Sequence, residues 1–219
     1  MTIAMDGPAG AGKSTVAKLT AKRLHMHYVD TGAMYRAIAY GIIKSGVSEE
    51  KAEEVVRCME VVVRYEEDEQ HVYVDGTDVM PFIRTPEISD AASRYSAKPF
   101  VREKLLETQR EIARTYDVIM DGRDIGTVVL PDADVKIFIT ADPYERARRR
   151  ALELEQRTGI QQDIEAIAQE IRERDYRDSH RAIAPLKQAE DAVLVDTTNL
   201  SIEEVVDEVC RLVEEKCNA

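Results

Sequence analysis

Short apolar runs alternate with longer stretches of helical periodicity along most of the chain. Within the longer stretches, apolar residues recur every three or four positions, which is the spacing of one helix face. The shorter runs are apolar throughout, as expected of strands that are buried on both faces of a sheet. This alternation predicts an α/β fold in which helices cover both faces of a parallel sheet. The predicted strands span residues 3–6, 28–30, 118–121, 135–140 and 193–196, and the predicted helices span residues 14–24, 33–44, 89–96, 101–115, 144–156, 164–178 and 202–213.

The pattern changes between residues 61 and 82. β-branched and aromatic residues gather there in two runs, 61–65 and 71–74, which are separated by polar residues typical of turns. We interpret this segment as a small antiparallel hairpin or meander inserted into the parallel core. Because no internal repeat or linker-like segment interrupts the chain, residues 1–219 are expected to fold as a single domain.

Three helix ends carry capping signals. Gly46 is expected to end the helix before it, because glycine readily adopts the left-handed conformation of a helix C-terminus. Ser48 is expected to cap the helix that follows. Ser201 and Glu204 have the spacing of a capping box at the start of the last helix.

A glycine-rich loop follows the first predicted strand and leads into the first predicted helix. Residues 7–14 read Gly-Pro-Ala-Gly-Ala-Gly-Lys-Ser, which fits the G-x-x-x-x-G-K-[ST] pattern of a P-loop. The flanking strand and helix argue against a chance glycine-rich turn, since a P-loop binds phosphates with backbone N–H groups at a helix N-terminus. Lys13 can reach the β- and γ-phosphates, and the Ser14 hydroxyl can bind the Mg²⁺ that accompanies ATP. The residues expected to bind ATP are Gly7, Pro8, Ala9, Gly10, Ala11, Gly12, Lys13, Ser14 and Thr15.

A P-loop is shared by switches, motors and small-molecule kinases, so other residues must decide between them. The chain has no Asn-Lys pair and therefore lacks the guanine-reading N-K-x-D motif of GTPases. It also has little sequence beyond one core, whereas mechanical ATPases normally carry further domains. Nine arginines lie between residues 146 and 181, which favours a phosphotransferase, although a solvated helix face would also explain single members of this group. If the second helix of this region extends far enough, Arg174, Arg177, Asp178 and Arg181 share one face, where guanidinium groups could bind phosphoryl oxygens.

Composition limits the partners of the chain. Its apolar fraction of 44% is typical of a globular protein, and its formal net charge of -12 disfavours nonspecific binding to nucleic acid or to an anionic membrane. No apolar run is long enough to span a bilayer, so a cytoplasmic location is expected. A monomer is the default expectation for the oligomeric state. The three cysteines form no C-x-x-C motif, and neither a disulfide framework nor a zinc site is indicated.

Four segments together resemble the bacterial cytidylate kinase family. They are Gly7 to Thr15, Asp30-Thr31-Gly32-Ala33-Met34-Tyr35-Arg36, Asp121-Gly122-Arg123-Asp124-Ile125-Gly126-Thr127, and Glu173-Arg174-Asp175 with Arg181-Ala182-Ile183-Ala184-Pro185-Leu186. The resemblance covers nearly the whole chain. It implies a P-loop core with an insert at residues 58–100 that binds a nucleoside monophosphate, and a mobile lid within the arginine-rich helices 144–181. The implied reaction is phosphoryl transfer from ATP, with Mg²⁺, to CMP or dCMP.

The resemblance also implies roles for single residues. Arg36 and Arg123 hold the acceptor phosphate, and Ser93, Arg102 and Asp124 read cytosine. A carboxylate suits the N4 amino group of cytosine, and a guanidinium or hydroxyl suits its N3 and O2 acceptors. The residues implied around the acceptor sugar and phosphates are Asp30, Asp178 and Arg181, and those that share the charge of the transferred group are Lys13, Arg123, Arg174 and Arg181.

Several alternatives stay open. Asp30 could simply cap the helix that follows it, and Ser93 could be an ordinary helix serine. Asp121 is a candidate to position Mg²⁺ through water, but a structural hydrogen-bonding role is nearly as plausible. No motif identifies a residue that reads adenine. The acceptor could instead be dephospho-coenzyme A or shikimate, and a noncatalytic nucleotide-binding regulator is the alternative outside the enzymes.

Overall fold

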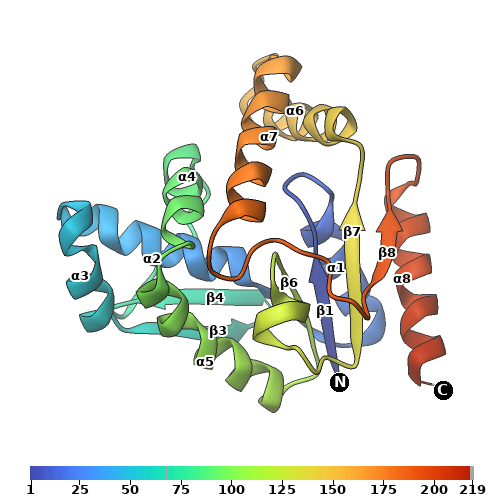
Figure 1. Ribbon diagram of the computed structural model, residues 1–219, viewed down its shortest axis with the longest axis horizontal. Helices are drawn as coiled ribbons and strands as arrows, with labels where there is room; N and C mark the ends of the chain where they lie inside the picture. Colours follow the sequence, from blue (N-terminus) through green and yellow to red (C-terminus); the bar gives the residue numbers. More distant parts are fainter. Residues whose placement is uncertain (68, 218–219) are drawn as a thin grey trace.

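Five parallel strands form the central sheet of the computed structural model (Figure 1). The description covers residues 1–67 and 69–217, apart from the side chains of Arg157 and Cys217. The spatial order of the strands is β2-β6-β1-β7-β8, and every neighbouring pair is parallel. The strands are β1 (Thr2–Asp6), β2 (His27–Asp30), β6 (Val118–Gly122), β7 (Val135–Thr140) and β8 (Val193–Asp196). All five predicted strands and the parallel α/β architecture are therefore confirmed.

Helices cover both faces of this sheet, as the sequence predicts. On one face, helices α1 (Lys13–Leu24) and α8 (Ile202–Cys217) pack against strand residues such as Ile3 and Ile137. On the other face, α5 (Pro99–Thr115) and a helical turn at Ile125–Val129 pack against residues such as Val29 and Met120. Side chains that alternate along a strand thus reach two different cores, which explains why the strand runs are apolar throughout.

The segment between β2 and α5 forms a second packed body beside the sheet. It contains a three-stranded antiparallel sheet, so the predicted meander is confirmed. Its core also includes buried residues of α2 and α3, so the packed body begins before residue 58. Its elements are α2 (Thr31–Ser45), a 3₁₀ turn (Glu49–Lys51), α3 (Ala52–Cys58), β3 (Val61–Glu66), β4 (Glu69–Val74), β5 (Thr77–Asp78) and α4 (Pro86–Tyr95).

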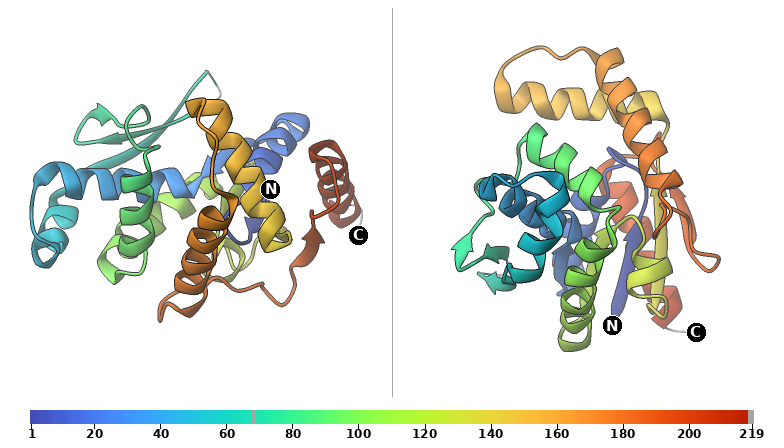
Figure 2. Two further views of the ribbon diagram at one scale, coloured as in Figure 1. Left: turned by 90° about the horizontal axis from the view of Figure 1, so that it is seen from above. Right: turned by 60° about the vertical axis from the view of Figure 1, so that its left-hand side comes forward.

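Two helices, α6 (Pro143–Thr158) and α7 (Ile164–His180), form a hairpin above the carboxyl edge of the parallel sheet. The right-hand view of Figure 2 shows this α6–α7 hairpin at the top of the molecule. The hairpin has a small core of its own, made mainly of alanine and isoleucine side chains. Asp142 caps α6 and Asp163 caps α7, each by accepting backbone N–H bonds in the first helical turn. Within the described residues, no helix is both long and apolar enough to cross a membrane.

The predicted helix ends are largely confirmed. Gly46 adopts the left-handed conformation after α2, with φ 67°. Ser201 and Glu204 exchange hydrogen bonds as a capping box, with 2.8 Å from Ser201 N to Glu204 Oε2 and 3.3 Å from Glu204 N to Ser201 Oγ. The prediction for Ser48 is wrong, because Ser48 precedes a 3₁₀ turn and its side chain caps no helical N–H group.

Candidate active site

The glycine-rich loop lies at the carboxyl end of β1, directly below the α6–α7 hairpin in Figure 1. Gly12 ends the loop with φ 85°, a left-handed conformation that residues with a side chain rarely adopt. Helix α1 begins at the next residue, Lys13. Gly12 has no side chain that could cap the helix. The first N–H groups of α1 therefore receive no hydrogen bond acceptor from the capping residue and stay available to a ligand in the loop. This is the arrangement that binds phosphate.

Cationic side chains converge above this loop. Lys13 is 6% exposed, and its Nζ donates a hydrogen bond to the Pro8 carbonyl at 2.6 Å. Burial, followed by the nearby Arg123 guanidinium, lowers the pKa of Lys13 well below its ordinary value. Burial and Arg123 also lower the pKa of Arg174 to about 10, with a further contribution from Arg36. The Nε of Arg174 is buried and has no hydrogen-bond partner among the described residues. Cations that repel one another in a protected site are suited to binding a polyanion.

Ser14 and Asp121 meet beside the loop. The Ser14 hydroxyl donates a hydrogen bond of 2.6 Å to the Asp121 carboxylate, which lies at the end of β6 and is 4% exposed. Burial raises the pKa of Asp121 to about 6, and the neighbouring Asp30 carboxylate adds to this shift. A hydroxyl and a carboxylate are the hard oxygen donors that Mg²⁺ prefers. The residues present therefore fit the predicted metal, and the observed hydrogen bond is the structural role that the sequence left open for Asp121.

Asp30 has more than a capping role. Its Oδ1 accepts the Ala33 N–H at 2.8 Å and so caps α2, while its Oδ2 accepts a bond of 2.9 Å from Arg36. Arg84, which the sequence did not single out, also reaches Asp30 Oδ2 at 3.4 Å. Arg36 and Arg84 thus lie together beside Asp30, which is in register with Asp121 on the adjacent strand. The positive groups of this cluster and those of the glycine-rich loop face one region at the carboxyl edge of the sheet.

Gln70 anchors Asp30 from the antiparallel sheet and was missed by the sequence reasoning. Its Oε1 accepts the Asp30 N–H at 2.7 Å, and its Nε2 donates to the Asp30 carbonyl at 3.2 Å. A signal existed, because Gln70 alternates with the buried Val72 and Val74 along β4. A polar residue at an inward position of a strand needs buried hydrogen-bond partners.

A second polar cluster lies around Asp124. The Asp124 carboxylate, 4% exposed, is held between the guanidinium groups of Arg102 and Arg181, with 3.0 Å from Arg181 Nη2 to Asp124 Oδ1. Ser96 joins the two arginines, since its carbonyl accepts from Arg102 and its hydroxyl accepts from Arg181 at 3.1 Å. The hydroxyl of Ser93, one turn before Ser96 on α4, is buried without a hydrogen-bond partner among the described residues. An unpaired buried hydroxyl is costly unless a ligand satisfies it.

The two polar regions are joined through Arg123 and Asp178. Arg123 Nε donates to the buried Asp178 carboxylate at 3.0 Å, and Arg123 is adjacent in the chain to Asp124. Tyr35 lies beside the polar cluster around Asp124, with its ring centroid 5.7 Å from Arg102 Cζ, and burial raises the pKa of Tyr35 to about 12. The sequence assigned Tyr35 no role, although it lies inside one of the four segments of the resemblance.

The predicted four-residue face of the second arginine-rich helix is not formed. Helix α7 ends at His180, and Arg181 continues in an extended conformation with ψ 142°, which turns it toward Asp124. Arg177 instead faces α4, where it pairs with Asp90 at 3.2 Å and stays 46% exposed. Arg174 and Asp178 do face the site.

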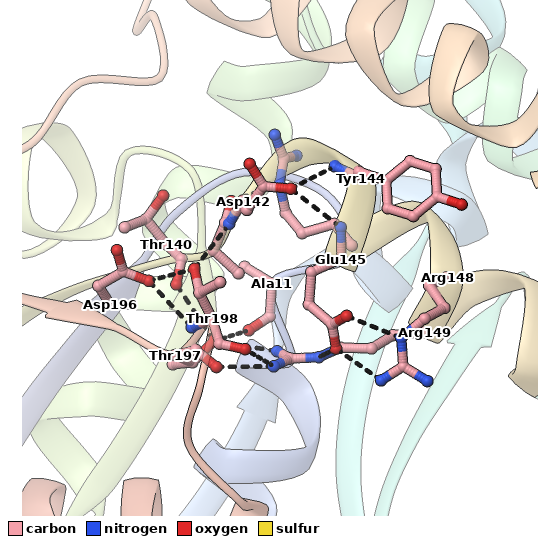
Figure 3. Close-up of polar contacts among 12 residues, drawn as sticks. Ala11, Thr140, Asp142, Tyr144, Glu145, Arg148, Arg149, Asp196, Thr197 and Thr198 are labelled. Atoms are coloured by element: carbon pink, nitrogen blue, oxygen red, sulfur yellow. Dashed lines mark hydrogen bonds and ion pairs between the residues drawn. The ribbon is translucent and has the colours of Figure 1, made fainter. Parts of the chain in front are cut away.

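A hydrogen-bond network fixes the start of α6 to the loop after β8 (Figure 3). Arg149 donates to the Thr197 carbonyl at 2.6 Å and to the Glu145 carboxylate at 2.9 Å. Hydrogen bonds from Arg148 and Arg149 lower the pKa of Glu145 to about 2. The Thr197 hydroxyl lies 3.4 Å from the Ala11 carbonyl, so the network also touches the glycine-rich loop. The sequence showed many arginines here but did not distinguish those with structural contacts.

Comparison with known proteins identifies the family. The sequence matches the cytidylate kinase family over residues 3–215. It is 51% identical to a cytidylate kinase of Lactobacillus gasseri over 99% of this chain and 95% of that protein, and 49% identical to one of Desulfitobacterium hafniense over 99% and 94%. A shikimate kinase of Bacteroides thetaiotaomicron has the same fold, with a TM-score of 0.50 at 15% identity over 98% of both chains. The chain belongs to the cytidylate kinase family.

Proposed function

We propose that the chain transfers a phosphoryl group from ATP to CMP or dCMP, which yields ADP and CDP or dCDP. The observation that carries this proposal is the polar cluster in which two arginines flank the buried Asp124 carboxylate near the unpaired Ser93 hydroxyl. Arg123 and Asp178 connect this cluster to the cations above the glycine-rich loop. Because one chain supplies all of these side chains, we propose that a monomer is active.

ATP is proposed to bind at the glycine-rich loop, residues 7–15, with its phosphates at the N-terminus of α1. Lys13 would move from the Pro8 carbonyl to the β- and γ-phosphates. Ser14 would hold Mg²⁺ directly and Asp121 would hold it through water. When bound, Mg²⁺ neutralises negative charge on the phosphates that it contacts.

The acceptor is proposed to bind between the second packed body and the parallel sheet. Asp124 would accept from the N4 amino group of cytosine, and Arg102 and Ser93 would donate to N3 and O2. Uracil would place an acceptor against Asp124. The acceptor phosphate would bind Arg36 and Arg123, and Asp30, Asp178 and Arg181 would lie around the acceptor sugar and phosphates. The exposed Arg84 is well placed to join Arg36 at the phosphate.

The reaction needs positioning and charge neutralisation more than proton transfer. The attacking atom is already an anionic phosphate oxygen, so a strong general base is unnecessary. In-line transfer would develop charge on the phosphoryl oxygens, which Lys13, Arg123, Arg174 and Arg181 would stabilise while the α6–α7 hairpin excludes water as a lid.

A panel of acceptors tests the proposal directly. Release of ADP from ATP is measured with CMP, dCMP, UMP, AMP, shikimate and dephospho-coenzyme A as acceptors. CMP and dCMP are expected to give much the highest kcat/KM. A preference for shikimate or dephospho-coenzyme A would contradict the proposed acceptor, and transfer to none of the six would support a noncatalytic regulator.

Replacing Arg174 by Met is expected to lower kcat roughly 10- to 100-fold, because a donor that faces the transferred group is lost. The nucleotide-free protein is expected to keep or raise its melting temperature, since the variant removes one of several mutually repelling cations. The control is Arg172→Met, which removes an exposed arginine that bonds to Gln169 on the same helix. A kcat within twofold of the control would contradict the role of Arg174.

Activity is expected to fall as the pH drops through about 6, the range of the raised pKa values of both Asp6 and Asp121. The buried Asp6 carboxylate accepts the N–H groups of Ile125 and Gly126, both at 2.8 Å, and so holds the turn that follows Asp124. Burial raises the pKa of Asp6 from 3.8 to about 6. A protonated carboxyl group cannot accept both bonds equally well, so the turn loosens in acid.

Stability has the opposite dependence on the titration of Asp6. Because its folded-state pKa is raised, its stabilising contribution is complete below about pH 3.8 and lost as the pH rises through about 6. The test compares kcat/KM for CMP with the melting temperature between about pH 8 and about pH 5. A flat activity profile, or a loss of activity that simply follows a falling melting temperature, would rule out this explanation.

A further inference from the structure

Asp175 connects the α6–α7 hairpin to the glycine-rich loop. It follows Arg174 on α7, and its Oδ1 accepts the backbone N–H of Ala9, the third residue of the loop, at 3.1 Å. The two residues are 166 positions apart, so only the folded arrangement of the hairpin brings them together. One backbone donor of the phosphate loop is thus engaged by a carboxylate from α7.

Arg146 completes the contact from the other helix of the hairpin. Its Nη1 donates to the Ala9 carbonyl at 2.9 Å and pairs with Asp175 Oδ2, while its Nε donates to the Ala141 carbonyl at 3.0 Å. Arg146 is 6% exposed. Both backbone groups of Ala9 are therefore bonded to the hairpin. The side chain of Arg146 is 7% exposed and that of Asp175 is 18% exposed, so removing one partner leaves the other charge largely desolvated and uncompensated.

Gly10 of the loop also lies directly against helices α6 and α7. A side-chain carbon added to Gly10 would lie 3.2 Å from Arg146 Cβ and 3.5 Å from Ile171 Cδ1. The glycine therefore allows the loop backbone to approach α6 and α7 closely. The close approach at Gly10 and the hydrogen bonds at Ala9 both show that the α6–α7 hairpin packs directly on the loop.

This contact adds to the attachment of α7 to the sheet. Burial, followed by the nearby Arg123 and Arg36 guanidinium groups, lowers the pKa of Arg174, the neighbour of Asp175, so these like charges repel one another. Asp178, one turn further along α7, offsets this repulsion through its ion pair with Arg123 at 3.0 Å. The hydrogen bond of Asp175 to Ala9 is a separate attachment of α7, at the glycine-rich loop.

We infer that Asp175 and Arg146 are positioning residues, which seat the hairpin on the phosphate loop and so keep Arg174 beside Lys13 and Arg123 at the transferred phosphoryl group. Neither residue needs to touch nucleotide in order to act this way. The inference rests on the proposed phosphoryl transfer. It predicts that the contact matters for the rate of the bound complex more than for binding of either substrate.

The test measures steady-state transfer from ATP to CMP in the Asp175→Asn, Arg146→Met and Arg146→Lys variants and in the Asp175→Asn/Arg146→Met double variant. For Asp175→Asn, kcat is expected to fall roughly 10- to 100-fold with KM for CMP changed less than about threefold. Arg146→Lys keeps the charge but cannot serve all three acceptors, so its kcat should lie between those of wild type and Arg146→Met. The double variant should be no slower than the slower single variant, because both changes break the same contact.

The control is Arg150→Met on α6, which loses an exposed pair with Glu153.

Hydrogen exchange of the Ala9 amide supplies a readout that does not depend on turnover. Exchange in the nucleotide-free protein should be faster in Asp175→Asn than in wild type and unchanged in Arg150→Met. If Asp175→Asn keeps kcat within twofold of wild type, or raises KM without lowering kcat, the inference is wrong. If Asp175→Asn fails to fold, the Arg146→Lys variant decides. The inference is wrong if this variant has the same kcat and the same exchange rate of the Ala9 amide as wild type. If wild type itself forms no CDP from ATP and CMP, the proposed function fails instead.

Discussion

Replacing Lys13 by Ala is expected to lower kcat for transfer from ATP to CMP on the order of 1000-fold. Lys13 is the cation at the start of α1, and its Nζ donates a hydrogen bond of 2.6 Å to the Pro8 carbonyl of the loop. In the proposed complex it neutralises charge that grows between the β- and γ-phosphates, a task that no other group in the first turn of α1 can perform. The measurement is steady-state ADP release with both substrates saturating.

The stability of the Lys13→Ala variant separates a catalytic effect from a folding effect. Burial and the nearby Arg123 already disfavour the charged form of Lys13, so removing the ammonium group should not lower the melting temperature of the nucleotide-free protein. Lys22→Ala is the matched control, because Lys22 is an exposed lysine on the same helix. Near-normal kcat in Lys13→Ala would refute the assignment of the loop as the ATP site.

The parts of the site that lie close together in the sequence could be predicted from it. The phosphate loop is one such part, since the glycines, Lys13 and Ser14 stand within eight consecutive residues between a strand and a helix. The capping box of Ser201 and Glu204 is another. In both cases the chemistry depends on backbone geometry within a few residues, which residue spacing encodes directly.

Contacts between distant segments were harder to predict. Apolar runs indicate strands but carry no information on which strands are neighbours, so the order β2-β6-β1-β7-β8 did not follow from them. The hydrogen bond between Ala9 and Asp175 joins two elements, and the sequence pattern of neither element indicates that they are in contact. Helical spacing even misassigned Arg177, because the helix ends before Arg181 and the packing of α7 against α4 turns Arg177 to Asp90. The proposal that Ser93, Arg102 and Asp124 read cytosine came from the family resemblance rather than from spacing.

Replacing Asp124 by Asn is expected to lower kcat/KM for CMP on the order of 100-fold and to remove most of the preference for CMP over UMP. The carboxylate can only accept hydrogen bonds, which suits the N4 amino group of cytosine. The amide that replaces it can turn its own N–H₂ toward the O4 acceptor of uracil. The measurement is kcat/KM for CMP and UMP at one ATP concentration, and the ratio of the two values is the quantity that matters.

The ratio is informative because the substitution also disturbs the fold. Asp124 is buried between Arg102 and Arg181, so its neutral replacement leaves two guanidinium groups with less compensation, and a lower melting temperature is expected. A loss of folded protein would reduce both kcat/KM values by the same factor and leave their ratio unchanged. Asp132→Asn is the matched control, since Asp132 is exposed. If CMP stays preferred over UMP as strongly in Asp124→Asn as in this control, Asp124 does not read the base, and the proposal loses its reason for a cytosine nucleotide as the acceptor.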